Sequence, residues 1–148
     1  MFSALVFVSL VVCASTDVGP ECLVGWWRNE LGSCLSITVI DNGTLWGTYN
    51  SKVGEAINEY PLVGRYDTRT DPDLLLYGRP LGWTVVWKNL DFPDSYSTTS
   101  WSALYYTSPE ELIHSTWLLT TSKEYTDVWS STQIGQDVFV KDSTCAPP

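Results

Sequence analysis

The segment Leu35–Asn50 reads LSITVIDNGTLWGTYN and contains the clearest fold signal in the chain. Two runs rich in β-branched and apolar residues flank the tripeptide Asp41-Asn42-Gly43. Asn and Gly both accept the positive φ angles that a tight hairpin turn needs. The segment therefore predicts two antiparallel strands, Leu35–Ile40 and Leu45–Asn50, joined by a short turn.

The same kind of run recurs along the rest of the chain, separated by turns rich in Gly, Asp, Ser and Pro. Eight consecutive short strands linked in this way predict an all-β fold, an eight-stranded antiparallel up-and-down β-barrel, because closure removes the exposed strand edges. The expected strands are Leu23–Asn29, Leu35–Ile40, Leu45–Asn50, Tyr60–Tyr66, Trp83–Lys88, Thr98–Tyr106, Leu112–Thr120 and Thr132–Lys141.

Two of the expected connections, Ser51–Glu59 and Thr68–Leu81, are longer than hairpin turns. Long loops on a small barrel are often lids over its mouth, and for Thr68–Leu81 packing on the rim or a subunit contact is the alternative. A helical period is indicated only at Pro109–Ile113 and in a turn near Trp129.

The first 14 residues carry no charge and are almost entirely apolar, which is typical of a secretory signal peptide and too short to span a bilayer as a helix. A buried N-terminal strand or helix is the alternative. With cleavage near Val12-Cys13-Ala14, we expect a secreted, extracellular protein with one domain at residues 15–148. No later stretch is long and apolar enough to cross a membrane, so no membrane partner is expected.

The 148 residues include 17 acidic and 8 basic side chains, for a net charge of −9. Such a chain repels phosphate backbones, which argues against a nucleic-acid partner and favours solubility as the role of the charge. The sequon Asn42-Gly43-Thr44 lies in the predicted turn and marks Asn42 as a glycosylation site in a secreted protein.

Three cysteines remain after the expected cleavage, and an oxidising compartment favours a disulfide between two of them. Cys22 opens the first strand and Cys145 follows the last, and those ends lie side by side in a closed barrel. We therefore predict a Cys22–Cys145 bridge that leaves Cys34 as a free or intermolecular thiol. Three cysteines and the single His114 do not make a convincing zinc site.

Catalytic signals are weak. His114 falls inside a strand-like run, and the chain has no Gly-x-Ser-x-Gly sequence. Glu110 and Glu111 are adjacent and would diverge on a turn, which is poor geometry for acid–base work across a bond. We expect a protein that is not an enzyme and has no cofactor. Scattered small polar residues among tryptophans instead favour a dry pocket for one flat, hydrogen-bonding ligand.

Six ordered segments resemble the avidin and streptavidin family, and together they cover nearly all of the chain after residue 14. The segments are GWWRNELGS at 25–33, GTYNSKVG at 47–54, LGWTVVWKN at 81–89, STTSW at 97–101, TWLLT at 116–120 and WSSTQIGQD at 129–137. The resemblance implies a barrel that binds biotin. The eight-stranded fold that it implies agrees with the number of strands predicted from the sequence.

The resemblance also implies roles for individual residues. Asn29, Ser33 and Tyr49 match the three donors to the biotin ureido oxygen, which they would polarise as an oxyanion hole does. Ser51 and Asp137 match the acceptors for the two ureido N–H groups, and an ionised Asp makes the stronger, charge-assisted bond. Further matches are Thr99 at the thioether sulfur, Ser97 and the Glu55 backbone N–H at the valeryl carboxylate, and Val53, Gly54 and Leu119 in the pocket wall.

Four tryptophans match the aromatic residues of the family's site. Trp87, Trp101 and Trp117 would surround the rings and chain of biotin. Trp129 matches a residue that caps the site of a neighbouring subunit, so the resemblance implies a homo-oligomer, with a tetramer favoured over a dimer.

Two other functions remain open on the residues alone. One is a barrel that binds a carbohydrate, an odorant or a lipid-like molecule, and the other is a structural protein with no ligand. Asp137 together with Asn29, Ser33 and Tyr49 suits a cyclic urea and would leave buried polar groups unpaired beside an apolar ligand.

Overall fold

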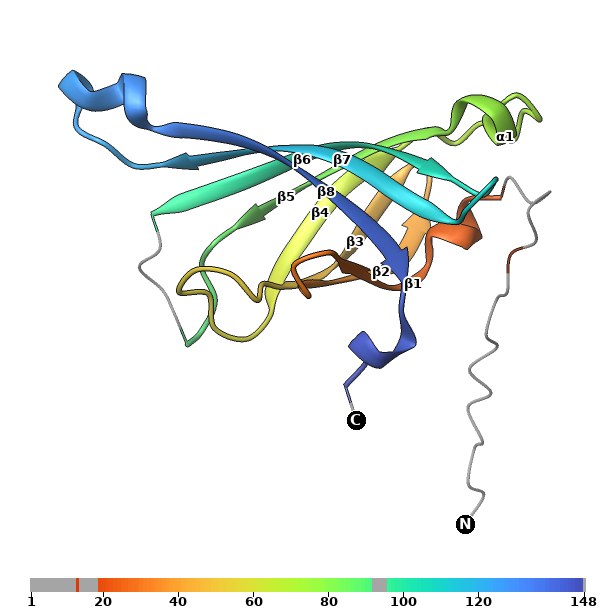
Figure 1. Cartoon of the computed structure of the whole chain (residues 1–148), viewed down its shortest axis with the longest axis horizontal. Coiled ribbons are helices and arrows are strands. Elements are labelled where there is room, and N and C mark those ends of the chain that lie inside the picture. The colour runs from red at the N-terminus through yellow and green to blue at the C-terminus, as the bar shows by residue number, and fades with distance from the viewer. Residues whose placement is uncertain (1–12, 14–18, 92–95, 148) are drawn as a thin grey trace, which may run out of the picture.

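A computed structural model describes residues 13, 19–91 and 96–147, and in it eight antiparallel strands close into one barrel (Figure 1). Each strand pairs with its neighbours in sequence, and β1 pairs with β8 to complete the barrel. The predicted fold class is confirmed. The strands are β1 (Gly25–Asn29), β2 (Cys34–Asp41), β3 (Thr44–Asn50), β4 (Tyr60–Tyr66), β5 (Arg79–Val86), β6 (Ser97–Tyr106), β7 (Leu112–Thr121) and β8 (Thr132–Lys141).

The hairpin between β2 and β3 has the turn that its sequence predicts. Asp41 pairs with Thr44, and the two residues between them have positive φ angles, 44° at Asn42 and 85° at Gly43. The Thr44 hydroxyl donates to Asn42 Oδ1 at 3.0 Å, and this side-chain hydrogen bond stabilises the turn.

Strand boundaries follow the predicted ones closely at β4 and β8. At β5 the prediction started too late, because Arg79 and Pro80 already pair with Tyr105 and Leu104 of β6. The helical period predicted at Pro109–Ile113 is wrong, since β7 begins at Leu112. The turn near Trp129 is present as a 3-10 helix, η2 (Tyr125–Ser130).

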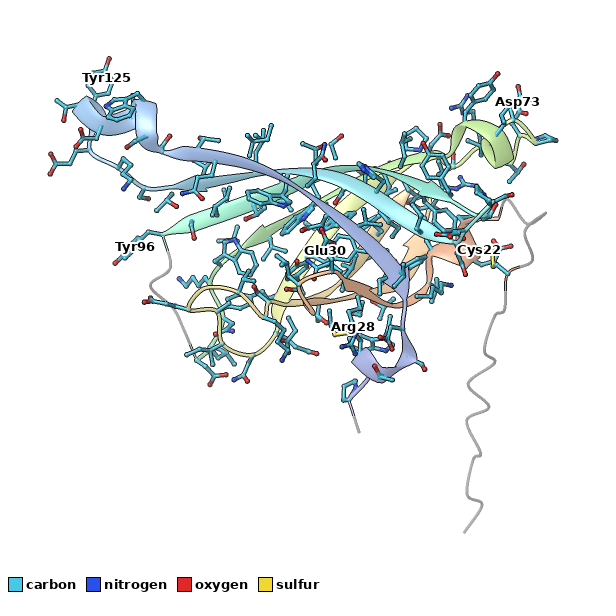
Figure 2. All side chains as sticks on the ribbon, in the orientation of Figure 1. Cys22, Arg28, Glu30, Asp73, Tyr96 and Tyr125 are labelled. Carbon is cyan, nitrogen blue, oxygen red and sulfur yellow. A yellow bond between two sulfur atoms is a disulfide. The ribbon has the colours of Figure 1, made fainter. Side chains whose placement is uncertain are left out.

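The barrel has two ends, and consecutive connections alternate between them. The 51–59 and 87–96 connections lie at one end, together with the β7–β8 connection, whose Ser122 N–H donates to Tyr96 O at 2.9 Å. The connection from β4 to β5 lies at the other end and holds the short helix α1 (Leu74–Tyr77), as the positions of Asp73 and Tyr96 show (Figure 2). Residues 68–81 therefore do not lie at the mouth that residues 51–59 border.

The disulfide prediction is also wrong. Cys34 pairs with Cys145, and Cys22, in the 3-10 helix η1 (Pro20–Leu23), pairs with Cys13, so none of the described cysteines is free. The C-terminal segment does reach β1, as a closed barrel requires. It then turns in the 3-10 helix η3 (Ser143–Cys145), so Cys145 meets the first residue of β2 instead of the start of β1.

Outward-facing polar contacts hold this C-terminal segment against β1. Arg28 forms an ion pair with Asp142 at 2.6 Å and donates to Thr144 Oγ1 at 2.5 Å. The Asp142 N–H donates to Trp26 O at 2.9 Å. Together with the disulfide, these bonds fix the β1–β2 corner on which two of the predicted site residues, Asn29 and Ser33, lie.

The predicted signal peptide, residues 1–14, lies outside the described residues apart from Cys13. Cleavage after Ala14 would remove Cys13 and leave Cys22 without its partner. Among the residues that the structure describes, no helix is long and apolar enough to cross a membrane.

Candidate functional site

A pocket of about 390 Å³ opens at the end of the barrel formed by the 51–59 and 87–96 connections. Most of its wall consists of residues that the sequence predicted, and Ala56 and Tyr60 were missed. Tyr60 begins β4, and its hydroxyl accepts the Ile57 N–H at 3.1 Å, which braces the 51–59 loop over the pocket. The lining residues are Ser51, Val53, Gly54, Glu55, Ala56, Tyr60, Trp87, Ser97, Thr99 and Leu119.

Aromatic rings join this pocket to the interior of the barrel. Trp87 lies edge-on to Tyr49 and Tyr60, with ring centroids 5.7 and 5.0 Å away. Trp101 lies 5.0 Å from Tyr49 and stacks on Trp83 at 5.6 Å. Because these rings contact one another in series, they form a continuous aromatic wall between the pocket and the interior of the barrel.

Four predicted polar residues, Asn29, Ser33, Tyr49 and Asp137, are buried behind the lining residues. The β1–β2 corner positions the first two, since Asn29 Oδ1 accepts the Ser33 N–H at 2.8 Å and the Leu31 N–H at 3.1 Å. The Asn29 amide is therefore held with its oxygen toward the backbone, and its N–H₂ group is left for the interior, where it hydrogen-bonds to Asp137.

Tyr49 is held as a neutral phenol. Burial is the main reason that its pKa lies well above the ordinary value, and the nearby Asp137 carboxylate raises the pKa further. A hydrogen bond with Ser33 acts in the opposite direction. Ser33 Oγ also accepts the Lys52 N–H at 3.0 Å, so this hydroxyl is fixed from a second side. Tyr49 and Ser33 thus present O–H donors at any physiological pH.

Asp137 is the acceptor at the centre of this group. Trp101 donates its indole N–H to Asp137 Oδ2 at 3.0 Å. Burial raises the pKa of the carboxyl, while hydrogen bonds from Trp101, Trp117 and Asn29 oppose that shift. A carboxylate has more lone pairs than these donors use, so Asp137 can accept from a ligand as well.

Glu30 is a functional neighbour that sequence reasoning missed. Its Oε2 accepts the Val138 N–H at 2.9 Å, which fastens the β1–β2 corner to β8 beside Asp137. Its charge contributes to the raised pKa values of both Asp137 and Tyr49. The available signal was its place directly after Asn29, at the end of a strand that pairs with β8.

Two predicted hydroxyls are already engaged within the pocket wall. Ser51 Oγ donates to Val53 O at 3.0 Å and accepts the Val53 N–H at 3.2 Å, which shapes the start of the 51–59 loop. Thr99 Oγ1 accepts the indole N–H of Trp87 at 2.7 Å and fixes that ring. Both oxygens retain an unused lone pair for a ligand.

Trp117 and Trp129 differ in their relation to the site. Trp117 lies over Gly135 of β8, where an added Cβ would come within 2.1 Å of the indole ring, so the glycine makes room for this tryptophan. Trp129 is 83% exposed and lies in η2 on the extended β7–β8 connection. Trp129 is not among the residues that line the pocket, and Tyr125, which begins η2, lies at the far end of the β7–β8 connection (Figure 2).

The described residues contain no group of His, Cys, Asp and Glu side chains that could hold a metal ion. The site therefore consists of neutral and charge-assisted hydrogen-bonding groups behind an aromatic wall. It can hold a small, flat molecule that offers one strong acceptor to Tyr49 and Ser33 and donors to Ser51 and Asp137.

Residues 18–142 match the model of the Avidin family. The chain is 30% identical over 146 residues to avidin of Gallus gallus, which covers 93% of this chain and 90% of avidin. Avidin-related proteins 2 and 1 of Gallus gallus are each 29% identical over 146 residues, covering 95% of this chain and 91% of theirs.

Proposed function

This chain belongs to the avidin family, and we propose that it binds biotin without a covalent bond in the pocket at the mouth of its barrel. The observation that carries the proposal is the buried group of Asn29, Ser33, Tyr49 and Asp137 behind an aromatic wall. Buried polar groups cost free energy unless they are paired, and a cyclic urea would pair with this group through both its oxygen and an N–H.

The urea oxygen of biotin would accept hydrogen bonds from the donors of this group. Tyr49 stays protonated because of burial and the Asp137 charge, so its O–H is available. The Ser33 hydroxyl and the Asn29 N–H₂ group are the other donors. The Lys52 N–H donates to Ser33 Oγ and the Ser33 N–H donates to Asn29 Oδ1, and these bonds hold the two side chains in place. Donors fixed before the ligand arrives need no reorganisation, which strengthens binding.

The two ureido N–H groups would donate to Ser51 and Asp137. The Asp137 bond would be charge-assisted, and its strength would depend on the exclusion of water by Trp101 and Trp117. Thr99 would lie at the thioether sulfur, and Trp87, Val53 and Leu119 would contact the aliphatic chain. Ser97 and the Glu55 backbone N–H, with Gly54 beside it, would meet the end of the valeryl chain.

We expect a binding protein without catalytic activity, secreted and oligomeric. The Cys34–Cys145 disulfide, which signal-peptide cleavage would leave intact, suits an oxidising compartment, and Asn42 is exposed in its turn for glycosylation. A homotetramer is favoured because η2 presents apolar side chains to solvent. Trp129 would cap the site of a neighbouring subunit there. The exposed residues are Tyr125 (92%), Trp129 (83%) and Val128 (58%).

The oligomer is tested with the variant Trp129→Lys. If Trp129 caps a neighbour's site, biotin should dissociate faster from this variant while the barrel remains as stable as the unaltered one. Leu76→Lys is the matched control, because Leu76 is 72% exposed on α1 at the other end of the barrel. Equal dissociation rates from both variants and the unaltered protein would refute the capping role.

Calorimetric titration with biotin tests the binding itself. We expect one biotin per chain, and about tenfold weaker binding by Tyr49→Phe, which keeps the ring and removes one donor. Tyr96→Phe is the control, because Tyr96 is exposed and does not line the pocket. No heat of binding at millimolar biotin, or unchanged affinity in Tyr49→Phe, would contradict the assignment.

A further inference from the structure

Glu55 is the one lining residue of the pocket with an ionisable carboxylate, and the described lining contains no Lys, Arg or His. The side chain is exposed at the pocket mouth, which the 51–59 loop lines together with Trp87 and Ser97. On the proposed function, on which this inference rests, this is where the tail of biotin ends. The mouth therefore places one fixed negative charge near a ligand group that is itself negative in free biotin.

Neighbouring cations do not neutralise this charge. Ion pairs of the described residues join Arg28 to Asp142, Arg69 to Asp67 and Lys141 to Glu111, and none of them includes Glu55. Lys52 Cγ lies 3.9 Å from the position of a Cβ on Gly32 in the β1–β2 corner, and Lys52 does not line the pocket.

Lys88 is the other lysine close in sequence to the pocket, since it follows Trp87. It lies in a separate hollow on the outside of the barrel, and two acidic residues, Glu59 and Asp91, line that hollow with it. With a net charge of −9 on the chain, the surroundings add to the negative potential at Glu55.

We propose that Glu55 makes this site select biotin whose carboxyl group is blocked as an amide over free biotin. The ureido and thioether ends of the two ligands are identical, so the buried groups bind them equally. At the mouth, free biotin brings a carboxylate near a like charge, and the repulsion offsets part of what the Ser97 hydroxyl and the Glu55 backbone N–H contribute. A biotinyl amide carries no charge there and offers an N–H that Glu55 or the Ser97 hydroxyl can accept.

The ligand class is therefore biotin joined through an amide bond, as it is when attached to an amine such as a lysine side chain. The effect is limited because Glu55 is exposed, and water and salt screen exposed charges. We expect free biotin to dissociate about three- to fivefold faster than biotinamide at low ionic strength, a size typical of one exposed charge pair.

Dissociation rates of biotin and biotinamide from the full chain test this selection. The variants are Glu55→Gln, which removes the charge and keeps the shape and the backbone N–H, and Glu59→Gln. Glu59 lies on the same loop, is exposed and does not line the pocket, so its variant changes the net charge equally. We expect the dissociation rate of free biotin divided by that of biotinamide to fall to near one in Glu55→Gln. The same ratio should stay unchanged in Glu59→Gln.

Salt gives a second readout of the same charge. The ratio in the unaltered protein should approach one at about 1 M salt, where charges more than a few ångströms apart are screened. A ratio that is the same in Glu55→Gln as in the unaltered protein would overturn the role of Glu55. If neither ligand binds at millimolar concentration, the proposed function itself fails, which is a different result from binding without selection.

Discussion

The two halves of the barrel interior are built from the same strands and differ in chemistry. On β1, Trp27 is fully buried in one half, and two residues later Asn29 is buried in the other. On β8, Phe139 pairs with Asn29, and Asp137 lies two residues nearer the β7–β8 connection, at the end of the barrel where the pocket opens. Inward-facing positions thus change from apolar to polar over one strand repeat.

The apolar half has the composition that stability requires, and the polar half does not. Fully buried Leu45, Trp27 and Ile113 gain free energy by leaving water. Asp137 is disfavoured by its surroundings, since burial raises the pKa of its carboxyl. Polar groups placed where they cost stability indicate selection for a ligand, and this difference is what the following experiments can break or sharpen.

The largest effect on stability is expected in the apolar half. Leu45→Ala leaves a cavity at a fully buried position and should lower the free energy of unfolding by about 2–5 kcal/mol. Chemical denaturation measures the loss. Val63→Ala is the control, because Val63 is 59% exposed and should change stability by less than about 1 kcal/mol. Equal losses in both variants would show that the two positions are not packed as described.

The opposite response is expected at Asp137. Asp137→Asn keeps the side-chain shape and removes a charge that burial disfavours, so the ligand-free barrel should be as stable as the unaltered one. Biotin should bind about ten- to a hundredfold more weakly, because a charge-assisted hydrogen bond is lost. Denaturation and calorimetric titration of the same sample separate the two quantities. If Asp137→Asn loses stability and keeps its affinity for biotin, Asp137 stabilises the fold and does not bind the ligand.

A smaller effect should appear in the pH dependence. The pKa of Asp137 is raised from its ordinary 3.8 in the folded chain, so the folded state keeps this proton more readily than the unfolded state does. The contribution of Asp137 to stability is therefore present below the ordinary pKa and lost as pH rises through the raised value. Biotin affinity should change in the other direction, falling as the carboxylate becomes protonated.

Melting temperatures and biotin dissociation rates measured from about pH 3.5 to about pH 7, a range that brackets the ordinary Asp pKa of 3.8, resolve these two trends. Asp137→Asn is the control and should show neither trend beyond the background from other groups. Stability and affinity that change together with pH, and do so equally in Asp137→Asn, would show that another group is responsible.

Most of the fold could be predicted from the sequence because the signals are local. Alternating residues set each strand, and Asn42-Gly43 sets one hairpin without help from the rest of the chain. The disulfides could not be predicted in this way. The pairing of Cys34 with Cys145 depends on the turn that η3 makes after β8 and on the contacts of Arg28 with Asp142, both of which are tertiary.

In the candidate site, too, residues with local sequence signals could be predicted, and residues whose roles depend on tertiary contacts could not. Residues that belong to sequence motifs, such as Ser51 and Trp87, were predicted and line the pocket. Tyr60 and Glu30 were missed because their roles come from contacts with other segments, a loop amide in one instance and a β8 amide in the other. Trp129 is exposed and does not line the pocket. The sequence around η2 gives no sign of this, and only the resemblance implied a place for Trp129 outside the pocket of the same chain.

A thermal melt of the protein with and without excess biotin tests the central claim most directly. A ligand that binds only the folded state raises the melting temperature by mass action. With the buried polar group and the aromatic wall acting as described, millimolar biotin should raise the melting temperature by about 10 °C or more. An unchanged melting temperature at that concentration would contradict the claim that the polar half of this barrel is a biotin site.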